Sequence, residues 1–171
     1  MILYHFGNYK IQKNMNNTNN NVFFTPVIIY HNADSDKSKI LVDNKNKAGI
    51  YMWIHIQSNK KYVESALNLS ERMYKCFSPL FLKRTDNYIS RVLIHYGYSV
   101  FSLSIIEFID ITNLSKKEAR KLILGHEQFY LDLIFSQDEP NTYNINPIAE
   151  SRLGSKHIED SLAKMSIAQS G

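Results

Sequence analysis

Hydrophobic residues first take on a regular pattern after an Asn-rich start, and there they predict a β-hairpin. Residues 49–56 are rich in β-branched and aromatic side chains, and so are residues 61–63. The polar stretch 57–60 between them has the composition of a turn. Tyr51 and Tyr62, with ten residues between them, would lie on facing strands, where the simplest interpretation is a cross-strand aromatic pair.

Three helices and one further strand follow. Apolar residues recur at helical spacing over 67–77, which a proline then closes, and over 86–96, where Asp86 is the N-cap candidate. Alternation over 101–105 predicts a half-buried strand, and a capping box at 115–118 begins the third helix. The residues expected on the inner faces of these helices are Leu69, Met73, Cys76, Ile89, Val92, Leu93, Tyr96, Ala119, Leu122, Ile123, His126, Phe129, Tyr130 and Leu133.

This order of elements favours an α+β domain with a small central antiparallel β-sheet of three strands, flanked by helices. We assign residues 47–147 to that domain. The Asn-rich residues 1–46 are expected to form a loosely structured N-terminal extension, with short apolar runs at 22–24 and 27–30 as candidates for local docking. Gly125 lies inside the third helix and costs about 1 kcal/mol relative to alanine, so packing should compensate for it.

Composition excludes several classes of site and singles out one charged stretch. The single cysteine, Cys76, excludes a disulfide framework or a Cys-rich zinc site, and the six histidines lack paired ligand spacing. No apolar run reaches the roughly 18 residues of a membrane span. The net charge of +4 is concentrated between Lys60 and Arg91, where seven cations accompany three anions. This concentration is typical either of a solvated surface or of a nucleic-acid footprint.

Three more residues do not fit a plain core pattern. Arg72 borders the apolar stripe of its helix, where an arginine commonly extends into solvent. Glu127 lies at the margin of an apolar face, and a half-buried anion requires a partner such as an arginine, a backbone donor or a metal ion. Arg72 or Mg²⁺ would serve. Asn144 follows a short loop, where a side-chain cap of a turn is the simplest interpretation.

Six sequence blocks join these positions in order. They are Gly49-Ile50-Tyr51, Tyr62-Val63-Glu64 and the segments 68–72, 96–103, 126–132 and 143–145. Over about 140 of its 171 residues the chain resembles the GIY-YIG nucleases, most closely the intron-encoded homing endonucleases of fungal mitochondria. Residues 148–171, with 151–157 and 163–166, resemble the start of a modular DNA-binding motif that follows the nuclease domain in such proteins, and we expect that motif to be truncated.

The resemblance implies a reaction and a set of site residues. It implies hydrolysis of DNA phosphodiester bonds with a single divalent metal ion, Mg²⁺ or Mn²⁺, bound by Glu127. Arg72 would neutralise charge on the phosphate, and Asn144 would hold the site together by hydrogen bonds. Tyr51 would activate or position the water, and Tyr62 would support it and the phosphate. The residues expected to contact DNA are Lys60, Lys61, Lys75, Arg152, Lys156 and His157.

Partners and location follow from the same resemblance. We expect double-stranded DNA as the partner of a monomer that does not contact a membrane. We also expect the chain to be encoded and made inside mitochondria, which agrees with the lack of a recognisable targeting peptide.

Two residues depart from the family pattern inside the expected site. Glu64 replaces a glycine, which adds bulk and a negative charge near the path of a phosphate. Cys76 stands where the family places tyrosine or histidine. These departures keep a second hypothesis open, a decayed homologue that binds DNA without cutting it. A third hypothesis, an RNA-binding splicing helper, has no residue in its favour.

Overall fold

The computed structural model of the chain describes residues 3–6, 9–12, 25–137 and 140–149. The expected DNA-binding motif lies outside these residues except for positions 148 and 149, and so do Arg152, Lys156 and His157. In the part of the chain that is described, no helix is both long enough and apolar enough to cross a membrane.

A four-stranded antiparallel sheet forms the centre of the domain, with the strand order β3-β6-β4-β5. Its strands are β3 (Ile28–Tyr30), β4 (Ala48–His55), β5 (Lys60–Ala66) and β6 (Phe101–Ile109). A separate two-stranded hairpin pairs β1 (Leu3–Phe6) with β2 (Tyr9–Gln12). The α+β fold with an antiparallel sheet is thus confirmed, and β3 adds a fourth strand to the three expected.

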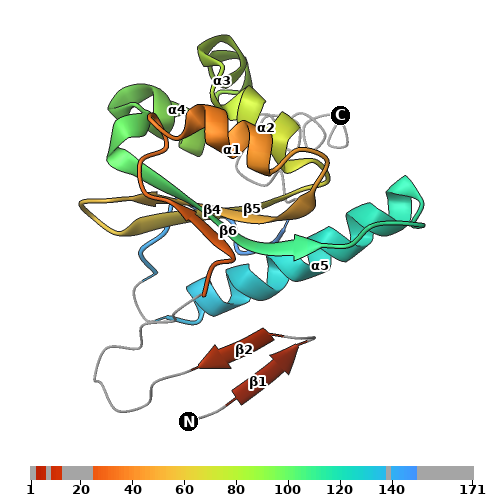
Figure 1. Cartoon of the computed structure of the whole chain (residues 1–171). Helices are drawn as coiled ribbons and strands as arrows, with labels where there is room; N and C mark the ends of the chain where they lie inside the picture. Colours follow the sequence, from red (N-terminus) through yellow and green to blue (C-terminus); the bar gives the residue numbers. More distant parts are fainter. Residues whose placement is uncertain (1–2, 7–8, 13–24, 138–139, 150–171) are drawn as a thin grey trace, which may run out of the picture.

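Helices cover both faces of the four-stranded sheet. They are α1 (Lys37–Asp43), α2 (Leu69–Cys76), α3 (Pro79–Thr85), α4 (Tyr88–Tyr96) and α5 (Lys116–Phe135), with a short 3₁₀ turn η1 (Tyr98–Val100) before β6. Figure 1 shows α1 to α4 gathered on one face and the long helix α5 on the other. The sheet is therefore the middle of three layers.

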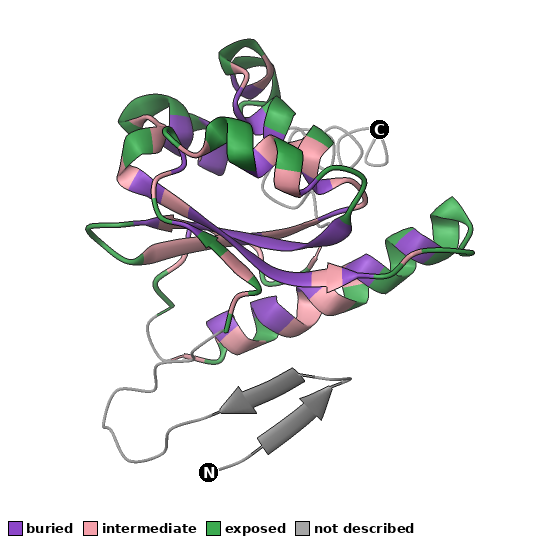
Figure 2. Cartoon of the chain, in the orientation of Figure 1, coloured by how far each residue is buried: buried purple, intermediate pink, exposed green. Residues whose placement is uncertain are grey.

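Two hydrophobic cores lie on either side of this sheet, because successive side chains of a strand point to opposite faces. Tyr51 and Trp53 of β4 are fully buried on the side of α2 to α4, whereas Ile50 and Met52 belong to the core beneath α5. In Figure 2 the central strands are largely buried along their length. Because both faces of these strands are buried, their sequences do not alternate between apolar and polar residues as a half-exposed strand does.

Part of the segment expected to be a loose extension belongs to the core, which corrects that expectation for residues 25–46. Tyr30 of β3 and Ile40 of α1 are buried with the helical core. The Tyr30 hydroxyl donates to Asp43 Oδ2 at 3.0 Å and accepts from Asn44 Nδ2 at 3.0 Å, so this hydroxyl is hydrogen-bonded inside the fold. With one buried residue in its seven, α1 has no apolar periodicity to detect.

The helices on that face differ from the expected ones mainly at their ends. Helix α2 begins close to the predicted start, and its N-cap is Asn68, whose Oδ1 accepts from the backbone of Glu71. The proline after it starts α3, an element too short for its pattern to be predicted. Asp86 ends α3 in the left-handed region with φ of 45°, and Asn87 rather than Asp86 caps α4.

Helix α5 begins at the predicted capping box, whose two reciprocal hydrogen bonds between Ser115 and Glu118 are both present. Its buried face is shifted from the expected one, because Leu131 and Ile134 are buried while Leu122 is exposed. Gly125 is exposed on this helix, and a Cβ added there would meet no neighbouring atom. The expectation that packing compensates for Gly125 is therefore wrong.

Candidate active site

The β4–β5 hairpin brings the three site candidates Tyr51, Tyr62 and Glu64 to one face of the sheet, together with Trp53. Tyr51 lies opposite Glu64, and Trp53 lies opposite Tyr62. Because residues two apart on a strand share a face, all four side chains point toward α2 to α4. Tyr51 and Tyr62 therefore share a face as predicted, although each has a different cross-strand partner.

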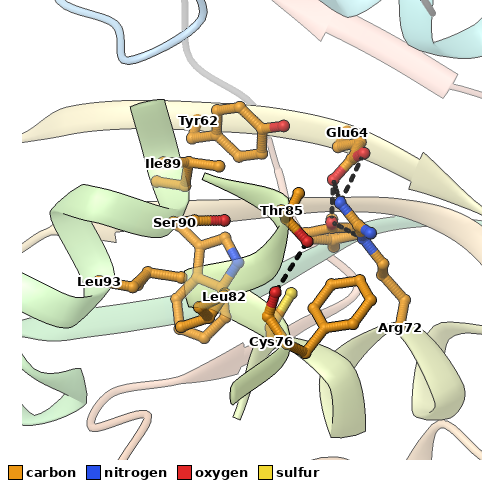
Figure 3. Close-up of a pocket in the computed structure, with 12 residues that line it drawn as sticks. Tyr62, Glu64, Arg72, Cys76, Leu82, Thr85, Ile89, Ser90 and Leu93 are labelled. Carbon is orange, nitrogen blue, oxygen red and sulfur yellow. Dashed lines mark hydrogen bonds and ion pairs between the residues drawn. The ribbon is translucent and has the colours of Figure 1, made fainter. Parts of the chain in front are cut away.

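Arg72 of α2 reaches this face and is held there by two residues of the hairpin. Its Nη2 donates to both carboxylate oxygens of Glu64, at 2.8 and 2.7 Å, and its Nε donates to the Tyr51 hydroxyl at 3.0 Å. The Tyr51 hydroxyl in turn donates to Glu64 Oε2. Figure 3 shows Glu64 and Arg72 facing each other across these bonds. The three side chains form a closed hydrogen-bonded group that combines one cation, one anion and one phenol.

Burial and charged neighbours together set the protonation states of Tyr51, Arg72 and Cys76. Burial raises the pKa of Tyr51 well above its usual value, although the nearby Arg72 lowers it, so the phenol is neutral near pH 7. The interactions of Arg72 with Tyr51 and Glu64 raise the pKa of the guanidinium, which stays charged. Burial also raises the pKa of the Cys76 thiol to about 12, so Cys76 is a neutral thiol at the end of the same helix.

A small pocket connects this group to the helices above it. Its polar side is formed by Glu64, Arg72 and Tyr62, and its far side by residues of α3 and α4 such as Phe81 and Ser90. Figure 3 shows Tyr62 and Glu64 on the strand and Thr85, Leu82 and Ile89 approaching from the helices. Charged and phenolic groups thus meet at one end of the pocket, whose other end is lined by apolar side chains together with Thr85 and Ser90.

Glu127 approaches the same edge strand from the other face. Its Oε2 accepts a hydrogen bond from the backbone N–H of Ser65 at 3.0 Å and another from the Ser65 hydroxyl. The residue is only 6% exposed. Burial raises its pKa, and the hydrogen bonds from Ser65 partly oppose that rise. Its protein partner is therefore a backbone and hydroxyl donor, whereas Arg72 pairs with Glu64.

A divalent ion at Glu127 would have this one protein carboxylate as its ligand. Among the described residues no group of three or more His, Cys, Asp and Glu side chains could hold a metal. Mg²⁺ commonly keeps several waters and binds through one or two carboxylates together with substrate phosphates. Both described hydrogen bonds to Glu127 are to Oε2. The site therefore fits an ion of that kind and does not fit an all-protein cage.

Asn144 closes the outer edge of β5. Its Oδ1 accepts from the backbone N–H of Val63 at 2.8 Å, and its Nδ2 donates to the Val63 carbonyl at 2.8 Å. Lys61 forms a parallel bridge with Thr142 just before it. Val63 directly precedes Glu64, which contacts Arg72, and Ser65, which contacts Glu127. The side chain of Asn144 therefore holds the strand segment that makes these two contacts. Asn144 acts on the site through the backbone and not as a turn cap.

The lysines expected to contact DNA have different environments. Lys60 Nζ lies over the rings of Tyr143, at 4.7 Å from the centroid, and Tyr88, at 5.8 Å. Lys61 Nζ donates to the Asn59 carbonyl at 3.2 Å, and burial lowers its pKa. Lys75 is exposed on α2. Of these three, Lys75 extends most openly into solvent.

Sequence reasoning missed a second polar cluster beneath α5. Glu107 of β6 is 4% exposed; its Oε1 lies 3.0 Å from His126 Nδ1, and its Oε2 accepts from the Tyr130 hydroxyl at 3.1 Å. The hydrogen bond with Glu107 raises the pKa of His126. In the sequence, this cluster was indicated only by an acidic residue, Glu107, within the apolar run 103–109. Ser65, the donor to Glu127, had no signal of its own.

The raised pKa of His126 predicts a pH-dependent contribution to stability. Because the folded-state pKa exceeds the unfolded value, the contribution is complete below pH of about 6.5 and is lost as the pH rises through the folded-state pKa. Urea unfolding should show wild type losing more stability than His126→Gln between pH 6 and pH 8. Equal losses in the two proteins would contradict the assignment.

Two relatives of this chain carry names of the same kind. Over 136 residues, or 79% of this chain, it is 33% identical to "Probable intron-encoded endonuclease 1" of Neurospora crassa, covering 41% of that protein. Over 149 residues, or 85% of this chain, it is 32% identical to "Probable intron-encoded endonuclease bI1" of the same organism, covering 31% of it. The chain thus spans less than half the length of these relatives. No family model matches it.

A solved structure is also similar. It is a mutant form of the catalytic domain of the intron endonuclease I-TevI, at 26% identity and a TM-score of 0.45, with 61% of this chain and 99% of that domain covered.

Proposed function

Because the chain belongs to the GIY-YIG nuclease family and has intron-encoded endonucleases among its relatives, we propose that it is a homing-type endonuclease that cuts double-stranded DNA. The observation that carries the proposal is the group formed by Tyr51, Arg72 and Glu64 on one side of β5, with Glu127 bound to the next residue of that strand. A buried carboxylate and a charged guanidinium beside one strand edge supply the two requirements of phosphodiester hydrolysis, a metal ligand and a cation for the phosphate.

Each residue has a separate task in the proposed reaction. The oxygen of a water molecule forms a bond to phosphorus and gives up a proton, the bond from phosphorus to the leaving sugar oxygen breaks, and that oxygen ends with one proton, so no net proton is consumed. Arg72 neutralises the charge on the phosphoryl oxygens. The protonated Tyr51 orients Arg72 through its hydroxyl, and therefore acts as a positioning residue and not as a base. Tyr62 lines the same pocket and supports the phosphate.

Glu127 would hold the divalent ion, Mg²⁺ or Mn²⁺. When bound, such an ion supplies Lewis acidity and orients the phosphate. Ser65 fixes Oε2 of Glu127, and Asn144 fixes the strand that carries Ser65. Ser65 and Asn144 thus restrict how far the Glu127 carboxylate and the neighbouring strand can move.

Glu64 supports a second candidate, a homologue that binds DNA but no longer cuts it. Both carboxylate oxygens of Glu64 contact the Arg72 Nη2 atom that a phosphate would use. A phosphate at Arg72 must compete with this internal anion, and repulsion between the two at about 4 Å amounts to roughly 1 to 4 kcal/mol. We favour an enzyme slowed by Glu64 because Arg72, Tyr51, Glu127 and Asn144 are all held in ordered contacts.

Removing the charge of Glu64 should accelerate cleavage. We expect wild type to cut intronless-allele DNA slowly in Mg²⁺ and not in EDTA, and Glu64→Gln and Glu64→Gly to cut at least about tenfold faster, because Arg72 is freed for the phosphate. Gel analysis of the cleavage products over time measures these rates. Glu71→Gln, a loss of the same charge from the exposed neighbour of Arg72, is the matched control and should cut like wild type.

The remaining outcomes separate the two candidates. Cleavage by a Glu64 variant but not by wild type would establish decay. If neither protein cuts, the nuclease proposal is contradicted. If wild type cuts and the Glu64 variants do not, Glu64 is part of the reactive group and its role as a competitor is wrong.

We also propose that the protein works as a monomer in mitochondria. The organellar location is supported by relatives named as intron-encoded. Sedimentation of the purified chain, and its detection in isolated mitochondria, would test the two statements separately.

A further inference from the structure

Helix α3 has two distinct faces, and only the inner one is explained by packing. Phe81, Leu82 and Thr85 line the pocket that also contains Arg72 and Glu64. Leu80, Lys83 and Arg84 have the spacing i, i+3, i+4 and therefore share the other face. All three are exposed, and Leu80 is 80% exposed. We call these three residues the outer face of α3.

The outer face stands directly over the proposed reaction site. The helix is a single layer of seven residues between the pocket and solvent, with its inner residues touching the site and its outer residues in water. Figure 1 shows α3 projecting from the helical layer at the far side from α5. A duplex with a phosphate at Arg72 is wider than this pocket, so its flanks would lie against the surface around the pocket, which includes this helix.

The charge of the outer face is not balanced within the described part of the chain. Neither Lys83 nor Arg84 forms an ion pair with a described acidic residue, and Arg84 instead lies over the Phe81 ring, 5.8 Å from its centroid. Asp86, the acid that follows the helix, is paired with Arg91 at 3.2 Å. The outer face therefore presents two cations that are available to an anionic partner.

Leu80 adds an exposed apolar group beside those two cations. A leucine at 80% exposure gains nothing from its position in the free protein. Exposed leucine, isoleucine and phenylalanine next to arginine and lysine are the groups with which proteins open the minor groove, by inserting between base steps while the cations bind flanking phosphates. Tyr74 on the neighbouring helix α2 is also largely exposed, at 70%.

The geometry points to the outer face of α3 as a DNA-contact surface, with Lys83 and Arg84 on backbone phosphates and Leu80 against the minor groove beside the cleavage site. This inference rests on the proposed function, because it takes DNA as the polymer that Arg72 binds. It assigns to α3 a task that none of the expected contact residues Lys60, Lys61 and Lys75 covers.

Fluorescence anisotropy with a 25-base-pair mixed-sequence duplex, in EDTA so that no cleavage occurs, tests the surface. Lys83→Ala/Arg84→Ala should bind roughly tenfold more weakly and lower the slope of log K against log salt by about 2, since each phosphate contact contributes about 0.9. The single variant Lys83→Ala, which keeps the Arg84–Phe81 contact, should lower the slope by about 1. Thermal unfolding should confirm that each variant is folded.

A pair of lysines on the opposite layer is the matched control. Lys116 and Lys117 are exposed at the start of α5, and Lys116→Ala/Lys117→Ala removes the same charge. This control should leave the affinity within about twofold of wild type. An equal loss of affinity in both double variants would mean that only net charge matters. It would contradict the assignment of the outer face of α3 as a DNA-contact surface but not the proposed function.

Two further measurements address the groove and the polymer. Leu80→Ala should bind several-fold more weakly and reduce the bend of the duplex measured by energy transfer between its ends, whereas unchanged bending would overturn the role of Leu80. Tighter binding to an RNA duplex of the same sequence would overturn the assignment to DNA. If wild type binds neither duplex at low salt, the proposed function fails together with the surface.

Discussion

Glu127→Gln is expected to lower cleavage by about 10³-fold and at the same time to raise the free energy of unfolding at pH 7. The loss of activity follows because an amide is a poor ligand for a divalent ion, whose contribution to such reactions is several kcal/mol. The gain in stability follows because burial raises the pKa of Glu127, so keeping it ionised opposes folding. One substitution should therefore separate what the reaction needs from what the fold needs.

The sign of the stability effect depends on pH. A carboxyl whose folded-state pKa lies above its unfolded value gives a contribution that is complete below pH of about 4.5 and is lost as the pH rises through the folded-state pKa. Glutamine does not ionise and so avoids this loss. The advantage of Glu127→Gln over wild type should accordingly be present at pH 7 and vanish at pH 4.

Urea unfolding in EDTA at the two pH values, combined with cleavage assays in Mg²⁺, measures both effects. Glu118→Gln is the matched control, because Glu118 lies on the same helix and its hydrogen bonds from Ser115 lower its pKa. That variant should cut like wild type and gain no stability at pH 7. If Glu127→Gln still cleaves at the wild-type rate, the assignment of the metal to Glu127 is wrong.

Gly49→Ala is expected to destabilise the domain by roughly 3 kcal/mol. A Cβ at Gly49 would lie 2.1 Å from the carbonyl oxygen of Glu107 and 3.2 Å from its carbonyl carbon, both on the backbone of the neighbouring strand β6. A backbone cannot move aside as a flexible side chain can, so β4 and β6 must separate. Tyr51 lies two residues further along β4, and cleavage should fall with the stability.

Gly125→Ala is the internal control for this prediction. The same methyl group at Gly125 meets no neighbouring atom on an exposed part of α5, and alanine favours the helix by about 1 kcal/mol. Chemical unfolding of the two variants should therefore give free-energy changes of opposite sign. Destabilisation by Gly125→Ala, or a neutral Gly49→Ala, would contradict the packing described for these two positions.

The parts of the fold that could be predicted are those whose signals are local. The hairpin, α2, α4 and α5 carry periodicity or caps within ten or twenty residues, and each was predicted close to its place. Strand β3 and helices α1 and α3 have seven residues or fewer. They are stabilised by contacts with distant elements more than by their own sequence pattern. Tyr30, for example, lies in the apolar run 27–30 that was a candidate for local docking, but nothing in the sequence shows that β6 pairs with this run.

The pairings within the candidate site could not be predicted, although the sequence named the residues that make them. Resemblance gave Tyr51, Arg72, Glu127 and Asn144, but the residue types do not say which acid pairs with which cation. Glu64 pairs with Arg72 because cross-strand register places it opposite Tyr51, and register is a property of the folded hairpin. Ser65 holds Glu127 because it points to the other face of the same strand.

The contact of Asn144 with Val63 also sets when the site can form. It joins residues 81 positions apart, so the loop that it closes comprises almost half of the chain. Closing so long a loop is slow and is rewarded only after the intervening elements have folded. During synthesis on a ribosome, the edge of β5 therefore stays unpaired until Asn144 has emerged. A nascent chain that already contains both tyrosines, Arg72 and Glu127 should consequently still lack the assembled site.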